Sequence, residues 1–262
     1  MRLRISAVLA AVAVLTLAGC GGGPSGAGGR PSGAPPTENA TLTVLAAASL
    51  TETFDAIEKQ FESEHPGVDV RINYGGSSDL AQQIVNGAPA DVFAAANDST
   101  MKTVTDAGLV KGSPTVFATN VLQIATAPGN PKGIHSFGDL ARPDLTVVVC
   151  APQVPCGSAT RRIEQATGVT IKPVSEEQDV KSVLGRVETG NADAGLVYVT
   201  DVRAVGDSVQ GVSFPEANRA VNNYPIATLT SAPQPELAQE FVGMVTGDFG
   251  TKTLQGAGFG TP

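Results

Sequence analysis

Along the chain, short apolar runs alternate with stretches in which apolar residues recur at the spacing of a helix. Residues 41–45 alternate as in a strand that enters a core, and residues 50–61 carry an apolar helical stripe. Residues 68–74 and 90–96 predict two further strands, each followed by another amphipathic helix. This alternation predicts a mainly parallel sheet with helices on both faces.

The second half of the chain repeats the arrangement after a long extended run at residues 116–125. Residues 145–150 predict a buried strand, and Gly168 ends the helix that follows it. A capping-box pattern that starts at Ser175 predicts a helix that ends near Gly190. The expected fold class is therefore α/β, with a second group of strands and helices after the extended run.

The length of 262 residues is more than one compact core needs, so one large lobe or two modest lobes are expected. Extended runs at 116–125 and 222–227 would carry the chain into a second lobe and back. We therefore expect lobe 1 at residues 41–119 and 224–262, and lobe 2 at residues 120–223.

The N-terminal stretch differs in composition from the rest of the chain. Arg2 and Arg4 are followed by an apolar run that is too short to span a bilayer comfortably. Residues 17–20 read Leu-Ala-Gly-Cys, which resembles the lipobox of bacterial lipoproteins. We expect a signal peptide at residues 1–19 and acylation of Cys20. The alternative is a signal peptide cut elsewhere, with a spare cysteine.

Glycine, proline, serine and alanine dominate the residues after this cysteine. Residues 20–40 are therefore expected to be the lipidated cysteine and a disordered tether, because they offer almost nothing to bury. The folded part would lie outside the cytoplasm, in the cell envelope, held to the membrane by its lipid.

Charge and cysteine content exclude several classes of function. The formal net charge of −8 argues against nucleic acid as a partner, and any anion would have to be bound by local donors. Cys150 and Cys156 are close in sequence, so outside the cytoplasm they could form a disulfide or remain two free thiols. The two histidines, His65 and His135, are not near them, which gives little support to a Cys–His metal site or nucleophile.

The clearest candidate chemistry lies where predicted strands end. Ser49 follows the first strand, and with Glu52 it matches a capping box that would only satisfy free helix N–H groups. The alternative is that its hydroxyl and these N–H groups hold an anion. Residues 75–78 repeat the arrangement with Ser77 after a glycine pair, and a later strand ends on Tyr198, either a rim residue or a ligand. Carboxyl ends of parallel strands form the usual ligand-binding edge.

Taken together, the order and spacing of several segments resemble the substrate-binding proteins of bacterial molybdate ABC importers, which are type II periplasmic binding proteins. These segments are residues 44–50, 76–78, 80–84, 87–93, 154–157, 179–180 and 195–198. The resemblance implies a two-lobed fold, each lobe a mainly parallel sheet flanked by helices, with a cleft that closes on a tetrahedral oxyanion. In that family neutral hydrogen-bond donors bind the ion.

The resemblance also implies a set of binding residues. Ser49 and Ser77 would each offer a hydroxyl and a backbone N–H group, and Tyr198 its hydroxyl. Cys156 and Val180 would offer backbone N–H groups only. Molybdenum would be held only as molybdate through these residues, with no cofactor. A disulfide between Cys150 and Cys156 would lie beside the ligand. Asp79 is assigned to the first turn of its helix and not to the cleft, which disfavours phosphate.

The expected function is capture of molybdate or tungstate by a monomeric lipoprotein that delivers it to a membrane permease with an ATP-hydrolysing partner. A sulfate- or phosphate-binding importer component is the main alternative. An enzyme on the same scaffold is disfavoured, because the proposed cleft has no histidine, no paired carboxylates and no nucleophile–base pair. A regulatory ligand-sensing domain is disfavoured because the predicted lipobox and tether leave no place for a DNA-binding module.

Overall fold

The computed structural model describes residues 39–262, which belong to one compact unit. The predicted signal peptide, Cys20 and the predicted tether as far as residue 38 lie outside the described residues. Ala40, expected in the tether, is instead the first residue of a strand, since it pairs with Val68 and its N–H group donates to the Gly67 carbonyl at 3.1 Å.

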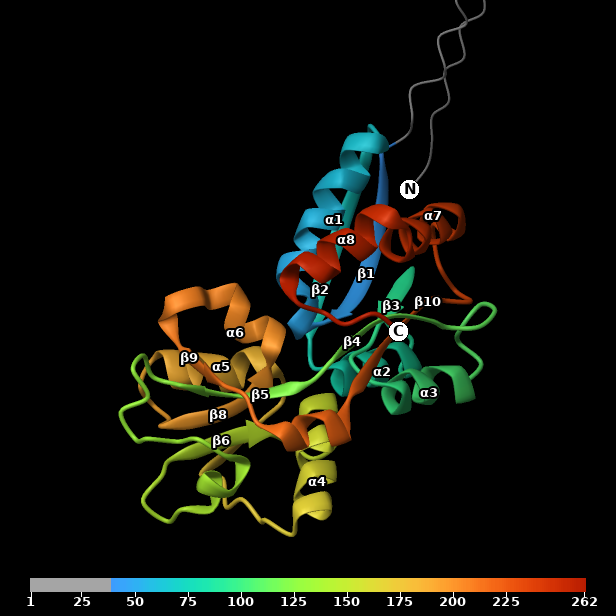
Figure 1. Cartoon of the computed structure of the whole chain (residues 1–262). Helices are drawn as coiled ribbons and strands as arrows, with labels where there is room; N and C mark the ends of the chain where they lie inside the picture. Colours follow the sequence, from blue (N-terminus) through green and yellow to red (C-terminus); the bar gives the residue numbers. More distant parts are fainter. Residues whose placement is uncertain (1–38) are drawn as a thin grey trace, which may run out of the picture. The chain divides into compact units, whose positions relative to one another are not determined.

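Two five-stranded sheets organise the described part of the chain (Figure 1). The first has the order β2-β1-β3-β10-β4. In it β1 runs parallel to β2 and β3, whereas β10 runs antiparallel to β3 and β4. Its strands are β1 (Ala40–Ala47), β2 (Val68–Gly75), β3 (Val92–Ala94), β4 (Thr115–Asn120) and β10 (Asn222–Thr228).

The second sheet has the order β7-β6-β8-β5-β9. Its β6 runs parallel to β7 and β8, and β5 runs antiparallel to β8 and β9. Its strands are β5 (Leu122–Thr126), β6 (Val147–Cys150), β7 (Ser175–Glu177), β8 (Ala194–Tyr198) and β9 (Gln210–Val212). We call the first sheet with its helices lobe 1 and the second sheet with its helices lobe 2. The prediction of a two-lobed α/β fold is confirmed.

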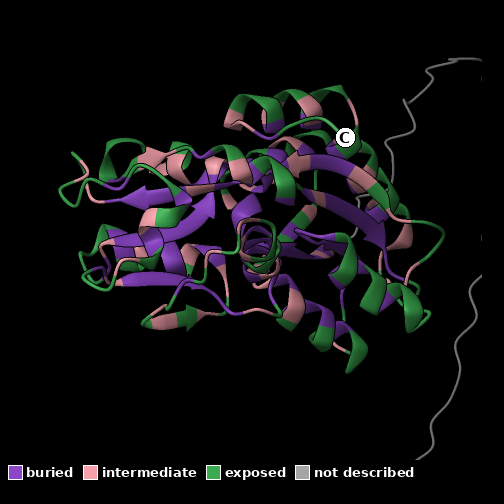
Figure 2. Cartoon of the chain, turned by 60° about the horizontal axis from the view of Figure 1, so that its bottom comes forward, coloured by how far each residue is buried: buried purple, intermediate pink, exposed green. Residues whose placement is uncertain are grey.

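Helices cover both faces of the lobe 1 sheet. One apolar cluster joins its strands to α1, α7 and α8, and a second joins them to α2 and α3. Figure 2 shows the strands largely in purple, as buried, and green on the outer faces of the helices. The bounds are α1 (Thr51–Glu64), α2 (Ser77–Val85), α3 (Asp98–Asp106), α7 (Pro235–Thr246) and α8 (Asp248–Ala257).

Lobe 2 has a single apolar cluster, which includes residues of its sheet and of α4 and α5. Its α-helices are α4 (Pro155–Thr167), α5 (Val180–Glu188) and α6 (Val199–Val205). Short 3₁₀ helices occur at Phe137–Ala141, Gly206–Ser208 and Pro215–Ala220. Within residues 39–262 no helix has the length and apolar character that crossing a bilayer requires.

The chain passes between the lobes twice, and the two crossings lie side by side. The first lies between β4 and β5, at Val121, and the second precedes β10. Asn120, at the end of β4, is the register partner of Asn222, at the start of β10. Two adjacent asparagines therefore lie at the junction of the lobes.

One predicted helix start is wrong. Ser175 was expected to open a helix, but it begins strand β7, which pairs with Val148 to Cys150 of β6. The helix begins five residues later at Val180, where Asp179 is the N-cap and accepts from the Ser182 N–H group at 2.8 Å. The sequence contains two possible helix caps here, Ser175 and Asp179. Because Ser175 pairs with β6, the helix begins after Asp179.

Candidate functional site

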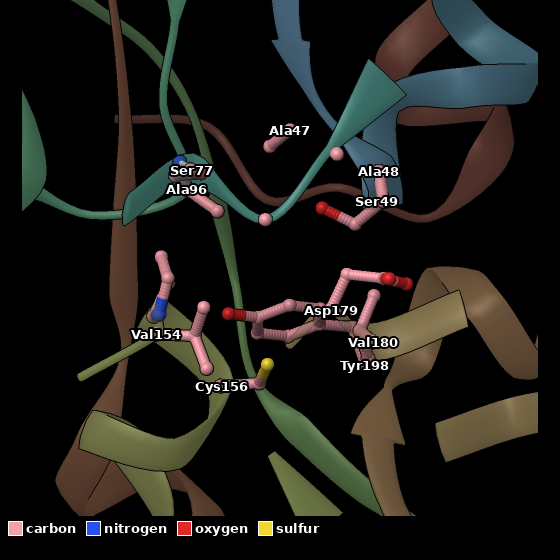
Figure 3. Close-up of a pocket in the computed structure, with 13 residues that line it drawn as sticks. Ala47, Ala48, Ser49, Ser77, Ala96, Val154, Cys156, Asp179, Val180 and Tyr198 are labelled. Atoms are coloured by element: carbon pink, nitrogen blue, oxygen red, sulfur yellow. Dashed lines mark hydrogen bonds between the residues drawn. The ribbon is translucent and has the colours of Figure 1, made fainter. Parts of the chain in front are cut away.

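A pocket lies between the lobes, where several strands end and several helices begin (Figure 3). It has about 220 Å³ of empty space, including the part open to solvent. All five residues predicted to bind an oxyanion line it. Its lining residues are Ala47, Ala48, Ser49, Gly75, Gly76, Ser77, Ala96, Val154, Pro155, Cys156, Asp179, Val180 and Tyr198.

Ser49 is not a helix cap. It lies in a 3₁₀ turn (Ala48–Leu50) that precedes α1, and the N-cap residue of α1 is Leu50, with no side-chain capping bond. The Ser49 side chain is buried, and its Oγ lies 2.9 Å from the hydroxyl of Tyr224 on β10. The capping interpretation of Ser49 is therefore wrong, and the hydroxyl is held by a residue far away in the sequence.

Ser77 is the first residue of α2 and is buried at the pocket. Its Oγ accepts a hydrogen bond from the Ala96 N–H group at 3.1 Å. Because the oxygen accepts, the hydroxyl hydrogen remains available to a ligand. The preceding Gly76 is the N-cap and supplies no side-chain capping bond, so the first N–H groups of α2 have no partner within the helix.

On the lobe 2 side, the N-terminus of α4 faces the pocket. Cys156 follows Pro155 at this end, and the N-cap Val154 forms no side-chain capping bond. A Cβ built on Gly157 would lie 2.0 Å from the Ala151 carbonyl oxygen, so only glycine permits this close approach to the end of β6. A disulfide joins Cys156 to Cys150, with the two Cα atoms 5.6 Å apart.

The N-terminus of α5 reaches the pocket through Val180. The N-cap Asp179 uses one carboxylate oxygen to accept from the Ser182 N–H group and the other to accept from the Ser182 hydroxyl, both at 2.8 Å. Asp179 also lines the pocket, although its position in the sequence indicates no binding role. Its aspartate-x-x-serine spacing is the one local signal that could have identified it as the cap.

Tyr198 ends β8, and its ring lies across the lobe 2 side of the pocket (Figure 3). It is only 1% exposed, and its hydroxyl oxygen accepts from the Asn222 Nδ2 group at 2.7 Å. Burial raises the pKa of Tyr198 well above its ordinary value. The phenol therefore keeps its hydrogen and remains a donor.

A buried carboxylate, Asp201, accepts a hydrogen bond from the backbone of this tyrosine. Asp201 is fully buried, accepts from the Tyr198 N–H group at 2.9 Å, and lies 3.3 Å from Lys181 Nζ. Burial raises the pKa of Asp201 to about 6, although Lys181 lowers it. Sequence reasoning found neither residue, because the contact depends on how α5 and α6 pack.

Several contacts join the lobes around the pocket. Lys181 Nζ donates to Glu52 of α1 at 2.7 Å, and the Ser78 hydroxyl donates to the Gln153 carbonyl at 2.7 Å. A Cβ built on Gly76 would lie 2.1 Å from the backbone oxygen of Gln178. The lobes therefore meet closely enough for donors of both to face one small ligand.

The pocket combines hydroxyl groups with helix N-termini and contains no lysine, arginine or histidine. Helix N-termini carry partial positive charge and free N–H groups, so they attract an anion without a cationic side chain. Asp79 lies in the first turn of α2 and is not among the lining residues. Within residues 39–262 there is no group of three or more His, Cys, Asp or Glu residues placed to hold a metal ion.

A sequence model of bacterial extracellular solute-binding proteins matches residues 42–260. The chain belongs to this family. It is 54% identical to the molybdate-binding protein ModA of Mycobacterium tuberculosis H37Rv over 230 residues, which cover 87% of this chain and 88% of the relative. It is 30% identical over 259 residues to the substrate-binding lipoprotein YvgL of Bacillus subtilis, a putative ABC transporter protein, with 96% of each chain covered. The family prediction is confirmed.

Solved structures share the fold. The periplasmic molybdate-binding protein of Azotobacter vinelandii has a TM-score of 0.73 at 24% identity, covering 84% of this chain and 99% of that one. The sulfate-binding protein SubI of Mycobacterium tuberculosis has a TM-score of 0.70 at 21% identity, covering 84% and 86%. Proteins that bind different oxyanions thus share this fold, so the fold alone does not select the ion.

Proposed function

We propose that this protein captures molybdate outside the cytoplasm and delivers it to an ABC importer. The observation that carries the proposal is the convergence of neutral donors from both lobes on one small pocket. The relative with 54% identity, named a molybdate-binding protein, supports molybdate as the ion. The protein would bind and release the ion without chemical turnover.

In the proposed complex, lobe 1 donates through the hydroxyl and N–H groups of Ser49 and Ser77. Lobe 2 donates through the N–H groups of Cys156 and Val180 and the hydroxyl of Tyr198. Hydrogen bonds to a charged partner are stronger than neutral ones, which offsets the loss of the ion's hydration. Only the closed arrangement offers donors from both lobes, so ligand binding favours closure.

Selectivity follows from the number and direction of the donors. Hydrogen phosphate carries a proton that needs an acceptor, whereas the proposed binding groups are donors, and the Asp179 carboxylate is engaged as the cap of α5 by its bonds from Ser182. Sulfate has the charge and shape of molybdate but is smaller, so it leaves some donors unsatisfied. Tungstate matches molybdate in shape and charge, and we expect it to bind as well.

We also propose that the protein is attached to the membrane by a lipid. Lipid attachment at Cys20 would keep the protein beside a permease and its ATPase, with the tether giving the monomeric binding domain reach. Mass spectrometry of the membrane fraction tests the anchor, because acylation would add lipid mass to the N-terminal peptide. Loss of membrane attachment in Cys20→Ala is the expected result, and unchanged attachment would contradict it.

Thermal unfolding tests the ligand. The chain without its signal peptide is heated with molybdate, tungstate, sulfate or phosphate at equal concentration. A ligand at about a hundred times its Kd adds roughly 2.7 kcal/mol, which shifts the Tm by about 5–10 °C for a chain of this size. We expect this shift with molybdate and tungstate only. A larger shift with sulfate would make the protein a sulfate importer component, and no shift with any ion would contradict oxyanion capture.

A further inference from the structure

Asn222 lies directly behind the pocket without lining it. It is the first residue of β10, where the chain returns to lobe 1, and it is 1% exposed. Its Oδ1 accepts from Arg162 Nη2. Its Nδ2 donates to the Tyr198 hydroxyl at 2.7 Å and to the Pro155 carbonyl at 3.2 Å.

These partners leave the amide only one orientation. A guanidinium group can only donate, and a backbone carbonyl can only accept. If the amide were flipped, its NH₂ group would face the Arg162 guanidinium and its oxygen would face the Pro155 carbonyl. Nδ2 therefore points at Tyr198, and the phenol oxygen must accept from it.

The orientation of the Asn222 amide determines which group the Tyr198 hydroxyl can donate its hydrogen to. Burial raises the pKa of Tyr198, and the hydrogen bond that Asn222 donates to the phenol oxygen lowers it. A phenol has one hydrogen and two lone pairs, and Asn222 donates to a lone pair, so this bond does not use the hydrogen. Tyr198 lines the pocket, so its hydrogen is available to a ligand there.

We propose that Asn222 is a specificity-determining positioning residue, which makes Tyr198 an obligatory donor to the bound anion. This inference rests on the proposed capture of molybdate. An obligatory donor favours an oxyanion with no proton, because a protonated oxygen would meet another hydrogen instead of an acceptor. Asn222 thus excludes hydrogen phosphate without contacting the ligand.

The test replaces the donor by an acceptor of the same shape. In Asn222→Asp, a carboxylate oxygen faces the phenol, so Tyr198 donates to residue 222 and turns a lone pair to the pocket. We expect molybdate affinity, measured by calorimetry, to fall at least about tenfold. The ratio of the Kd values for phosphate and molybdate should fall as well.

A double-mutant cycle separates positioning from added charge. The new carboxylate also repels the anion, but it does so equally in a Tyr198→Phe background, which has no phenol hydrogen to redirect. We expect Asn222→Asp to reduce affinity at least about tenfold more with Tyr198 present than in that background. Equal losses with and without the phenol would overturn the positioning role. Failure of the unsubstituted chain to bind molybdate would instead overturn the proposed function.

A second pair of variants keeps the inference testable if Asn222→Asp does not fold. Arg162→Met removes the donor that orients the amide, and Arg161→Met removes the neighbouring exposed charge on the same helix. We expect molybdate affinity to fall several-fold in Arg162→Met and to stay unchanged in Arg161→Met. Equal affinities of the two variants would contradict the inference.

Discussion

The two lobes supply the pocket with different kinds of donor. Lobe 1 presents serine hydroxyl groups, each supported by a distant partner: Tyr224 beside Ser49 and the Ala96 N–H group beside Ser77. Lobe 2 presents the starts of α4 and α5, where the donors belong to the main chain, and adds the phenol of Tyr198. Side-chain donors are lost with one substitution, whereas main-chain donors are lost only when the helix start moves.

The largest effect on molybdate affinity is expected from a substitution that keeps the two lobes apart. In Gly76→Ala the new Cβ would meet the Gln178 carbonyl oxygen at 2.1 Å, so the lobes cannot close fully. We expect molybdate affinity to fall by about a hundredfold or more, since at least two charge-assisted bonds of roughly 1.5–3 kcal/mol each are lost. Calorimetry measures the loss.

Gly243→Ala, in α7 and outside the pocket lining, is the control. Its Cβ would have no atom within 4 Å. Affinity within about twofold of the unsubstituted chain is expected there. If Gly76→Ala binds as tightly as this control, the close contact between the lobes does not govern binding.

A second effect of nearly this size concerns the buried carboxylate behind Tyr198. Burial raises the pKa of Asp201 from 3.8 to about 6, so between these pH values the folded chain holds a proton that the unfolded chain has released. The unfolding free energy should therefore fall as pH rises from about 4 to 6, by about 3 kcal/mol relative to Asp201→Asn. Urea unfolding of both chains at pH 4, 5, 6 and 7 measures this. A difference that is constant or increases with pH would contradict the assignment.

Removal of one lobe 1 hydroxyl should have a smaller effect. Ser77→Ala loses one hydrogen bond to a charged ligand, which corresponds to about 1.5–3 kcal/mol, or roughly a tenfold to hundredfold rise in Kd. Ser99→Ala, on the exposed side of α3, serves as control and should bind normally. Unchanged affinity in Ser77→Ala would remove this serine from the binding set.

The smallest effect on affinity is expected on the lobe 2 side. Replacing both Cys150 and Cys156 by alanine removes the disulfide but keeps the N–H group at position 156, so molybdate affinity should change by less than about fivefold. Stability should still fall, by roughly 2–3 kcal/mol for so short a loop, and the Tm by about 5–10 °C. A loss of affinity as large as in Ser77→Ala would show that the disulfide holds the helix start in place.

Much of the fold follows from local patterns, because apolar periodicity predicts the strands and helices around both pocket serines. Local patterns fail where distant pairing decides. Ser175 begins a strand instead of a helix because β6 lies beside it. Ser49 matches a capping box but contacts Tyr224 instead, 175 positions away.

The pocket residues also divide into those that the local sequence indicates and those that it does not. Ser49, Ser77 and Tyr198 carry hydroxyl groups at strand ends, so residue type alone makes them candidates. Main-chain donors can be offered by almost any residue, so only the family resemblance indicated Cys156 and Val180. Supporting side chains such as Asn222 and Asp201 have no local signal, because their roles depend on contacts between separate elements.

The position of β10 in the first sheet has a consequence for the order in which the molecule assembles. All five strands of lobe 2 lie between Leu122 and Val212, so this lobe can complete its sheet as one uninterrupted piece. Lobe 1 cannot, because β10 lies between β3 and β4 and follows lobe 2 in the sequence. Domains tend to fold as units while a chain emerges from its N-terminus. We therefore expect the half of the pocket that comes first in the sequence to be the last to form.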